Sequence, residues 1–93
     1  MKFKGDPKLQ VKILSPSQTY YEGPAHSVSA VNKVGPFDVL ANHANFFSLL
    51  SKGDIVVSTP GQELRFPIED GIVKVTNNAV TLFVYLPSSN PQQ

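Results

Sequence analysis

His43 is the residue whose type most directly suggests chemistry, because a histidine side chain titrates near neutral pH and binds metal ions. The only other histidine is His26, and the chain contains no cysteine. A metal site would therefore need carboxylates that converge from distant loops. We expect a structural or interface role for His43, and neither a metal site nor a catalytic site built on it.

The hydroxyl and carboxylate side chains also lie outside the patterns that serve catalysis. No Gly-x-Ser-x-Gly turn is present to expose a serine nucleophile, and no Gly-rich phosphate loop ending in Gly-Lys-Ser/Thr occurs. Glu63, Glu69 and Asp70 cluster near expected turns, where we interpret them as solvated charges and not as an acid and base pair. The sequence predicts no enzyme, no catalytic residue and no cofactor.

The elements that position these side chains are predicted to be short β-strands. Runs rich in Val, Ile, Leu and Phe are separated by turn residues at spacings typical of all-β domains. These runs are residues 11–14, 27–31, 54–58, 63–68, 71–76 and 79–86. Pro60-Gly61 and Asn77-Asn78 are predicted hairpin turns, and Glu69-Asp70-Gly71 is a further candidate.

The remaining helical candidate is residues 44–53, which match the period of a helix poorly and are predicted as loop and short strand. The eight prolines suit strand ends and edges and oppose long central helices. We therefore predict an all-β fold, an antiparallel β-sandwich or flattened barrel. Residues 1–86 are expected to form one domain, and residues 87–93, which lack apolar periodicity, a disordered tail.

Composition excludes two classes of direct partner. The formal net charge is +1 and the cations are scattered, which argues against nucleic acid, since phosphate binding uses concentrated Lys and Arg. The longest apolar run is Leu82 to Leu86, far shorter than the roughly 20 residues that span a bilayer as a helix. The start of the chain, MKFKGDPKLQ, has no signal or transit character. We expect no direct insertion into a bilayer.

Two segments carry a resemblance to a known family, the epsilon subunits of F-type ATP synthases. Residues 14–28 resemble its opening strands, in which LSP is followed by an aromatic-Glu-Gly-x-Ala run. The matching residues are Leu14, Ser15, Pro16, Tyr21, Glu22, Gly23 and Ala25. Residues 34–45 are similar to the signature Gly-x-aromatic-Gly-apolar-Leu-Pro-x-His-Ala-Pro, and the matches are Gly35, Phe37, Val39, Leu40, His43 and Ala44. The departures are Asp38 for Gly, and Ala41 and Asn45 for Pro.

Further matches follow in the family's order. Leu50 and Gly53 fill a Leu-x-x-Gly pattern, residues 68–75 stand for Ile-Ser-Gly-Gly-aromatic-x-x-Val, and residues 77–84 stand for Asn-Asn-x-Val-Thr-Val-Leu. The resemblance covers about Leu9 to Leu86. It implies the N-terminal domain of the epsilon subunit, a ten-stranded sandwich of two five-stranded sheets.

The resemblance implies a non-catalytic subunit of the central stalk in a proton-translocating synthase, which links the gamma subunit to the membrane c ring for rotary coupling. The residues it places toward the gamma subunit are Ser15, His43, Phe46 and Ser48. The loop it places toward the c ring comprises Lys33, Val34, Gly35, Pro36, Phe37 and Asp38. The implied location is the cytoplasmic side of a bacterial plasma membrane, or alternatively the stromal side of a plastid thylakoid.

Two departures from the family bear on this interpretation. Members usually continue with two antiparallel helices that in some bind ATP; this helical hairpin is absent here, so no nucleotide binding is expected. In the loop toward the c ring, Pro36 and Asp38 stand where the family has a polar or acidic residue and a glycine. Residues two apart in extended backbone point to the same side. Asp38 could therefore replace the acidic residue, or it could only bind a backbone amide in a turn.

Two other functions remain open at this point. A free-standing binding module, for example for carbohydrate, would need Tyr20, Tyr21 and Phe46 to line one face. A small hydrolase would need His43 bonded to a nucleophile and to a third orienting group. Phe46 and Phe47 are neighbours on an expected strand, so one ring should enter the core and the other should meet solvent or a partner.

Overall fold

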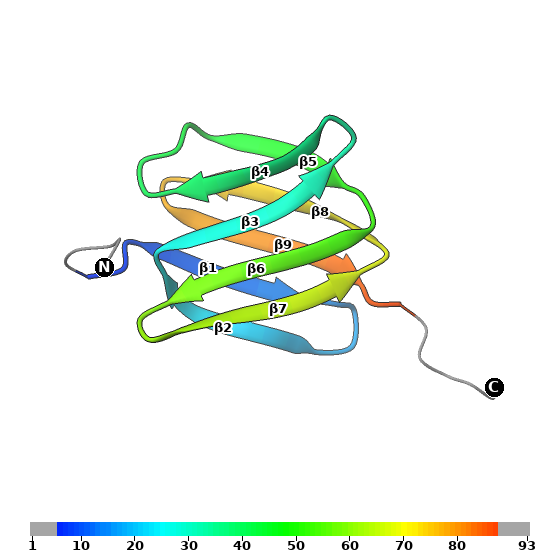
Figure 1. The fold of residues 1–93 in the computed structure, drawn as a ribbon, viewed down its shortest axis with the longest axis horizontal. Helices are drawn as coiled ribbons and strands as arrows, with labels where there is room; N and C mark the ends of the chain where they lie inside the picture. Colours follow the sequence, from blue (N-terminus) through cyan, green and yellow to red (C-terminus); the bar gives the residue numbers. More distant parts are fainter. Residues whose placement is uncertain (1–5, 88–93) are drawn as a thin grey trace.

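The computed structural model describes residues 6–87, which form nine β-strands and no helix (Figure 1). The strands are β1 (Leu9–Leu14), β2 (Thr19–Ala25), β3 (Ser27–Asn32), β4 (Gly35–Leu40), β5 (Phe46–Leu50), β6 (Gly53–Thr59), β7 (Gln62–Ile68), β8 (Asp70–Thr76) and β9 (Ala79–Tyr85). Within this range no helix is long and apolar enough to cross a membrane. The predicted all-β class and the strand at residues 46–50 are confirmed.

The strands form two sheets that pack face to face as a sandwich. One sheet has the order β2-β1-β9-β8-β5, and the other has the order β4-β3-β6-β7. The implied ten strands and two five-stranded sheets are therefore wrong by one strand. Residues 41–45 turn instead of extending: Asn42 has a φ of 67°, and the His43 N–H donates to the Leu40 carbonyl at 3.1 Å.

The prediction of a fully antiparallel arrangement is also wrong at one position. β1 and β9 run parallel, with Val11 opposite Val80 and Ile13 opposite Leu82. β2 follows β1 after a short turn and takes up one side of it in the antiparallel sense. The other side of β1 is filled by the last strand of the chain, in the middle of the sheet.

Alternation along the strands builds the core between the two sheets. In β9, Val80, Leu82 and Val84 point into the core and are buried. Phe83 and Tyr85, which alternate with them along the strand, are exposed. Each fully buried aliphatic side chain contributes roughly 1.5–3 kcal/mol. The buried set is Leu9, Val11, Ile13, Ala25, Val28, Ala30, Val39, Leu50, Ile55, Val57, Ile68, Val73, Val75, Val80, Leu82 and Val84.

The hairpin turns lie where they were predicted. Asn77 and Asn78, between β8 and β9, have φ angles of 49° and 68°, and Gly61, between β6 and β7, has a φ of 90°. Positive φ at these positions is what tight hairpin turns require. At Glu69-Asp70-Gly71 only Glu69 lies between strands, since the other two residues belong to β8. Of the tail predicted for residues 87–93, residues 88–93 lie outside the described residues.

Candidate functional site

The segment predicted as a loop toward the c ring is a β-hairpin. Only Lys33 and Val34 form its turn, and residues 35–38 are the first part of strand β4. The loop interpretation is wrong because β4 pairs with β3 along its whole length, with Asn32 opposite Gly35 and Ser27 opposite Leu40. Figure 1 shows the tip of this β3–β4 hairpin at one end of the sandwich, with β4 and β5 along the same side.

One side chain fixes the hairpin tip, that of Asn32. Its Oδ1 accepts hydrogen bonds from the backbone N–H groups of Val34 at 2.9 Å and Gly35 at 3.2 Å. Its Nδ2 donates to Ser48 Oγ on β5 at 3.2 Å. The tip of the hairpin and β5 are therefore held together by the same residue, although they belong to different sheets.

Phe46 sits at the centre of a small aromatic cluster on this side. Its ring lies 5.4 Å from the Phe37 ring and 5.5 Å from the His43 ring, both near edge-to-face geometry. Phe46 packs against the core, whereas the Phe47 side chain is 63% exposed. The predicted split of the two rings is confirmed, and the outward ring belongs to Phe47, which the sequence did not place on a contact surface.

The environment of His43 does not form a catalytic constellation. Nδ1 lies 2.7 Å from the Ala44 carbonyl oxygen, which can only accept, so Nδ1 carries the proton and donates. The other contact of the imidazole is the Phe46 ring. Neither partner is a nucleophile. Among residues 6–87, no three His, Asp or Glu side chains gather in a way that could hold a metal ion.

Ser15 is not brought together with the other residues predicted to face the gamma subunit. It follows β1, and strands β9 and β8 separate β1 from β5. Ser15 Oγ accepts hydrogen bonds from the backbone N–H groups of Ser17 at 3.2 Å and Gln18 at 3.3 Å. The described contacts therefore give Ser15 the role of closing the turn between β1 and β2. His43, Phe46 and Ser48 instead contact the residues of the β3–β4 hairpin or one another.

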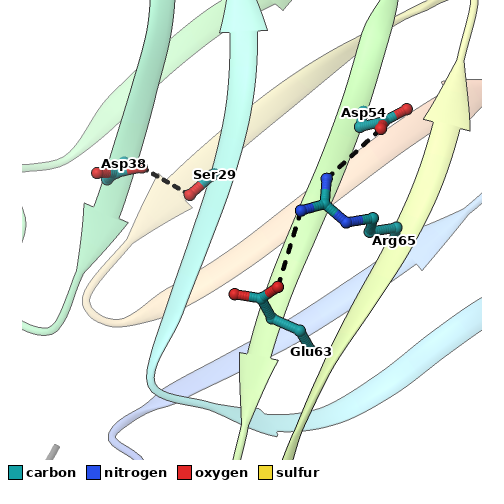
Figure 2. Close-up of polar contacts among 5 residues, drawn as sticks. All are labelled: Ser29, Asp38, Asp54, Glu63 and Arg65. Atoms are coloured by element: carbon teal, nitrogen blue, oxygen red, sulfur yellow. Dashed lines mark hydrogen bonds and ion pairs between the residues drawn. The ribbon is translucent and has the colours of Figure 1, made fainter. Parts of the chain in front are cut away.

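Asp38 lies on the outer face of the four-stranded sheet, where its Oδ1 accepts a hydrogen bond of 2.6 Å from Ser29 Oγ on β3 (Figure 2). The alternative in which Asp38 binds a backbone amide in a turn is therefore wrong, because Asp38 is on a strand directly opposite Ser29. Asp38 and Pro36 are both exposed on that face, as the alternation predicted.

Figure 2 shows a second polar group on the same face, farther across the sheet. Arg65 on β7 lies 3.6 Å from Asp54 on β6 and 3.8 Å from Glu63 on its own strand. All three side chains are at least about half exposed, so each ion pair contributes only about 0–1 kcal/mol. This outer face is therefore polar and well solvated.

The opposite outer face, on the five-stranded sheet, is apolar and was missed. Leu49, Ile72 and Phe83 are in register across β5, β8 and β9. Together with Asp70, Gly71, Leu50 and Tyr85 they line an open hollow of about 440 Å³. The unbroken apolar run Leu82 to Leu86 was a signal for this apolar face. A strand that is apolar on both faces, packed on the core with only one of them, presents the other to solvent or to a partner.

The aromatic platform that a carbohydrate-binding module would need is not formed. Tyr21 is on β2 and Phe46 on β5, the two opposite edges of the five-stranded sheet. The Tyr21 hydroxyl donates to the Pro24 carbonyl at 2.7 Å, and burial raises the pKa of this tyrosine. Its ring also lies 6.5 Å from the Phe66 ring of the other sheet. Both rings are therefore used in packing at separate places.

Alanine substitution of the two adjacent phenylalanines should distinguish the ring that packs on the core from the ring that is exposed. Phe46→Ala removes a ring that contacts Phe37, His43 and the core, and we expect a loss of about 2–3 kcal/mol in the free energy of unfolding. Phe47→Ala should change it by less than about 1 kcal/mol. Urea denaturation followed by circular dichroism measures both. A Phe47→Ala loss equal to that of Phe46→Ala would contradict the assignment of the outward ring.

Comparison with known proteins gives one consistent result. Residues 8–85 match the model of the ATP synthase delta/epsilon chain β-sandwich domain. The ATP synthase epsilon chain of Maricaulis maris is 35% identical over 75 residues, which is 81% of this chain and 56% of that protein. The epsilon chain of Stenotrophomonas maltophilia strain K279a is 33% identical over 75 residues, or 80% of this chain and 54% of that one. The chain spans about half the length of these relatives.

Two solved structures share the fold. A chain in the mitochondrial ATP synthase of Euglena gracilis, a structure of OSCP, F1 and the c-ring, superposes with a TM-score of 0.78 at 17% identity, covering 90% of this chain and 56% of that one. A chain in the central stalk/c-ring structure of the Tetrahymena thermophila mitochondrial ATP synthase gives 0.74 at 14% identity, covering 88% and 66%. With the match over residues 8–85, these likenesses lead to one conclusion: the chain belongs to the family of ATP synthase delta/epsilon chain β-sandwich domains.

Proposed function

We propose that this domain serves in the epsilon subunit of the central stalk of a proton-translocating F-type ATP synthase. It carries out no chemistry of its own, and it connects the gamma subunit to the c ring so that rotation is transmitted between them. The observation that carries the proposal is the family match over residues 8–85, together with the names of the relatives as epsilon chains. The location that follows is peripheral, on the cytoplasmic side of a bacterial plasma membrane or the stromal side of a plastid thylakoid.

The architecture suits a connector, which must resist deformation and bind on more than one side. The core is a continuous set of interdigitated aliphatic side chains between two sheets, and such packing transmits strain with little compression. The outer face of the five-stranded sheet exposes large apolar side chains, which in a soluble protein mark an interaction surface. The most exposed of these side chains are Phe47, Leu49, Phe83 and Tyr85.

We assign the gamma subunit to the side formed by β5 and the turn before it. His43, Phe46 and Ser48 lie there, and Phe47 adds the exposed ring that an interface anchor needs. Ser15 belongs to this surface only if the partner extends across the five-stranded sheet as far as the end of β1. The c ring is assigned to the β3–β4 hairpin, residues 33–38.

Titration of the chain against the gamma subunit of the same organism, without nucleotide, tests this proposal. We expect a dissociation constant of tens of micromolar or tighter, about 6 kcal/mol. Phe47→Ala should weaken binding by about 1–2 kcal/mol, as loss of an exposed anchor does. Leu40→Ala, which removes a half-exposed side chain from edge strand β4 of the other sheet, is the matched control. Absence of heat and of comigration for the unmodified chain would contradict the assignment.

A further inference from the structure

The tip of the β3–β4 hairpin and strand β5 border one shallow hollow of about 380 Å³. Its lining residues are Asn32, Lys33, Val34, Phe47, Ser48 and Leu49. Val34 is 96% exposed, and Phe47 and Leu49 are 63% and 69% exposed. Three large apolar side chains thus surround a surface that also presents a lysine, and no carboxylate lines it.

The hollow is fixed in shape before any partner arrives. The Asn32 side chain caps the turn through Val34 and Gly35 and reaches Ser48 on the opposite wall. Because the turn is already held in one conformation, less conformational entropy is lost when a partner binds. Exposed apolar side chains on a preorganised tip are features of a contact surface rather than of a mobile loop.

The charges around the hollow are positive. Lys33 is part of the lining, and Lys74 lies directly beside Phe47 on β8 and is exposed. The carboxylate of the hairpin, that of Asp38, instead accepts from Ser29 on the outer face of the four-stranded sheet. A partner that approaches the tip therefore meets lysines and apolar side chains, and complementarity requires an acidic group on the partner.

The adjoining strand also lacks the usual protection of a sheet edge. β5 pairs only with β8 among the described residues, and its sequence FFSLL contains neither proline nor a charged residue. The other edge strands, β2, β4 and β7, each contain a proline and at least one charged residue. Such residues discourage unwanted pairing at exposed edges. Their absence from β5 indicates that this edge is covered by a partner in the assembly.

We propose that this hollow binds a loop of the c ring that presents a carboxylate next to an apolar side chain. The carboxylate pairs with Lys33, and the apolar side chain packs against Val34 and Leu49, while Phe47 on the border of the hollow is left to the gamma subunit. The inference rests on the proposed function and specifies its chemistry. In the family resemblance the acidic group belongs to this subunit, and the proposal reverses that polarity. The tip here carries Lys33 and Val34, whereas the carboxylate of Asp38 lies on the outer face of the four-stranded sheet.

Carbodiimide coupling in the complete synthase tests the pairing. The reagent activates a carboxylate, the lysine amine attacks it, and an amide bond forms while the carboxylate oxygen leaves on the reagent as a urea. We expect a Lys33 cross-link to a c-subunit carboxylate, identified by mass spectrometry. Lys33→Arg keeps the charge but cannot form the amide, so the cross-link should vanish while coupling is retained. A Lys33 cross-link to the gamma subunit, or none at all, would overturn the proposal.

Charge reversal provides a functional measure that does not depend on the reagent. Lys33→Glu should lower proton pumping coupled to ATP hydrolysis about two- to fivefold at low salt, with a smaller effect at high salt. Val34→Asp should lower it about tenfold, because it removes the apolar anchor and adds a like charge opposite the partner's acid. Lys8→Glu is the matched reversal and should have no effect, because Lys8 is exposed and directly precedes β1. Figure 1 shows the start of β1 at the end of the sandwich opposite the tip of the β3–β4 hairpin.

These outcomes distinguish the two proposals. If the unmodified chain fails to assemble with its gamma subunit and c ring, both the proposed function and the inference that rests on it are contradicted. If it assembles and couples normally, but Lys33→Glu and Val34→Asp behave like Lys8→Glu, only the inference is overturned.

Discussion

Gly71→Ala is expected to lower the free energy of unfolding by about 3 kcal/mol. A Cβ at position 71 would collide with the backbone carbonyl oxygen of Phe83 and would lie 3.1 Å from Val84 Cα. These are backbone atoms of β9, which is paired with β1 on one side and β8 on the other, so they cannot move aside. Urea denaturation monitored by circular dichroism gives the value directly.

Gly23→Ala is the matched control for this substitution. The three atoms nearest to the added Cβ would all belong to the Tyr21 side chain, the closest being its hydroxyl at 3.2 Å, and a side-chain end can shift. We expect a loss below about 1 kcal/mol. If both alanine variants lose the same amount, the cost at position 71 comes from β-sheet propensity in general and not from the close approach of β9.

Leu82→Ala should lower the free energy of unfolding by about 3–5 kcal/mol. Leu82 is fully buried on the central strand β9, and its neighbours across the ladders are Ile13 and Val73. Truncation leaves a cavity that a strand paired on both sides cannot close by moving, so the cost should fall in the upper part of the usual range. Thermal unfolding followed by circular dichroism should show a lower midpoint with unchanged cooperativity.

Phe83→Ala, one residue farther along β9, provides the comparison. Phe83 is 47% exposed on the outer face, and its truncation in the isolated domain should cost less than about 1 kcal/mol. A cost as large as that of Leu82→Ala would mean that the outer face of the five-stranded sheet is packed in solution, for example by a second copy of the chain.

The strands that could be predicted from the sequence are those with a clear run of apolar residues, which are the interior strands and the edge strand β7. β1, β3, β6, β7, β8 and β9 all overlap the predicted runs. β2 and β4 are not among the runs predicted from periodicity, because each contains a Gly-Pro pair, which is typical of a turn. Both are edge strands, where the missing N–H of proline can face solvent without a lost hydrogen bond.

Only part of the candidate site could be predicted, because the rest depends on strand register and on contacts between the two sheets. Alternation required Phe46 and Phe47 to face opposite ways, but the choice of the inward ring depends on how β5 registers with β8, where Phe46 lies opposite Val75. The role of Asn32 had a signal that was overlooked, since Asn before a two-residue turn often caps it through its side chain. Its bond to Ser48 across the two sheets depends on the fold and has no local signal.

The parallel pairing of β1 with β9 has a consequence for the synthesis of the chain. Because β9 lies between β1 and β8, the centre of the five-stranded sheet is missing until residues 79–85 have left the ribosome. Early segments can form hairpins, but the sheet cannot close before β9 has emerged. Contacts between the first and last strands also raise the contact order, which slows folding. The domain should therefore acquire its structure only after residues 79–85 have emerged, with the apolar surface of β1 exposed to chaperones until then.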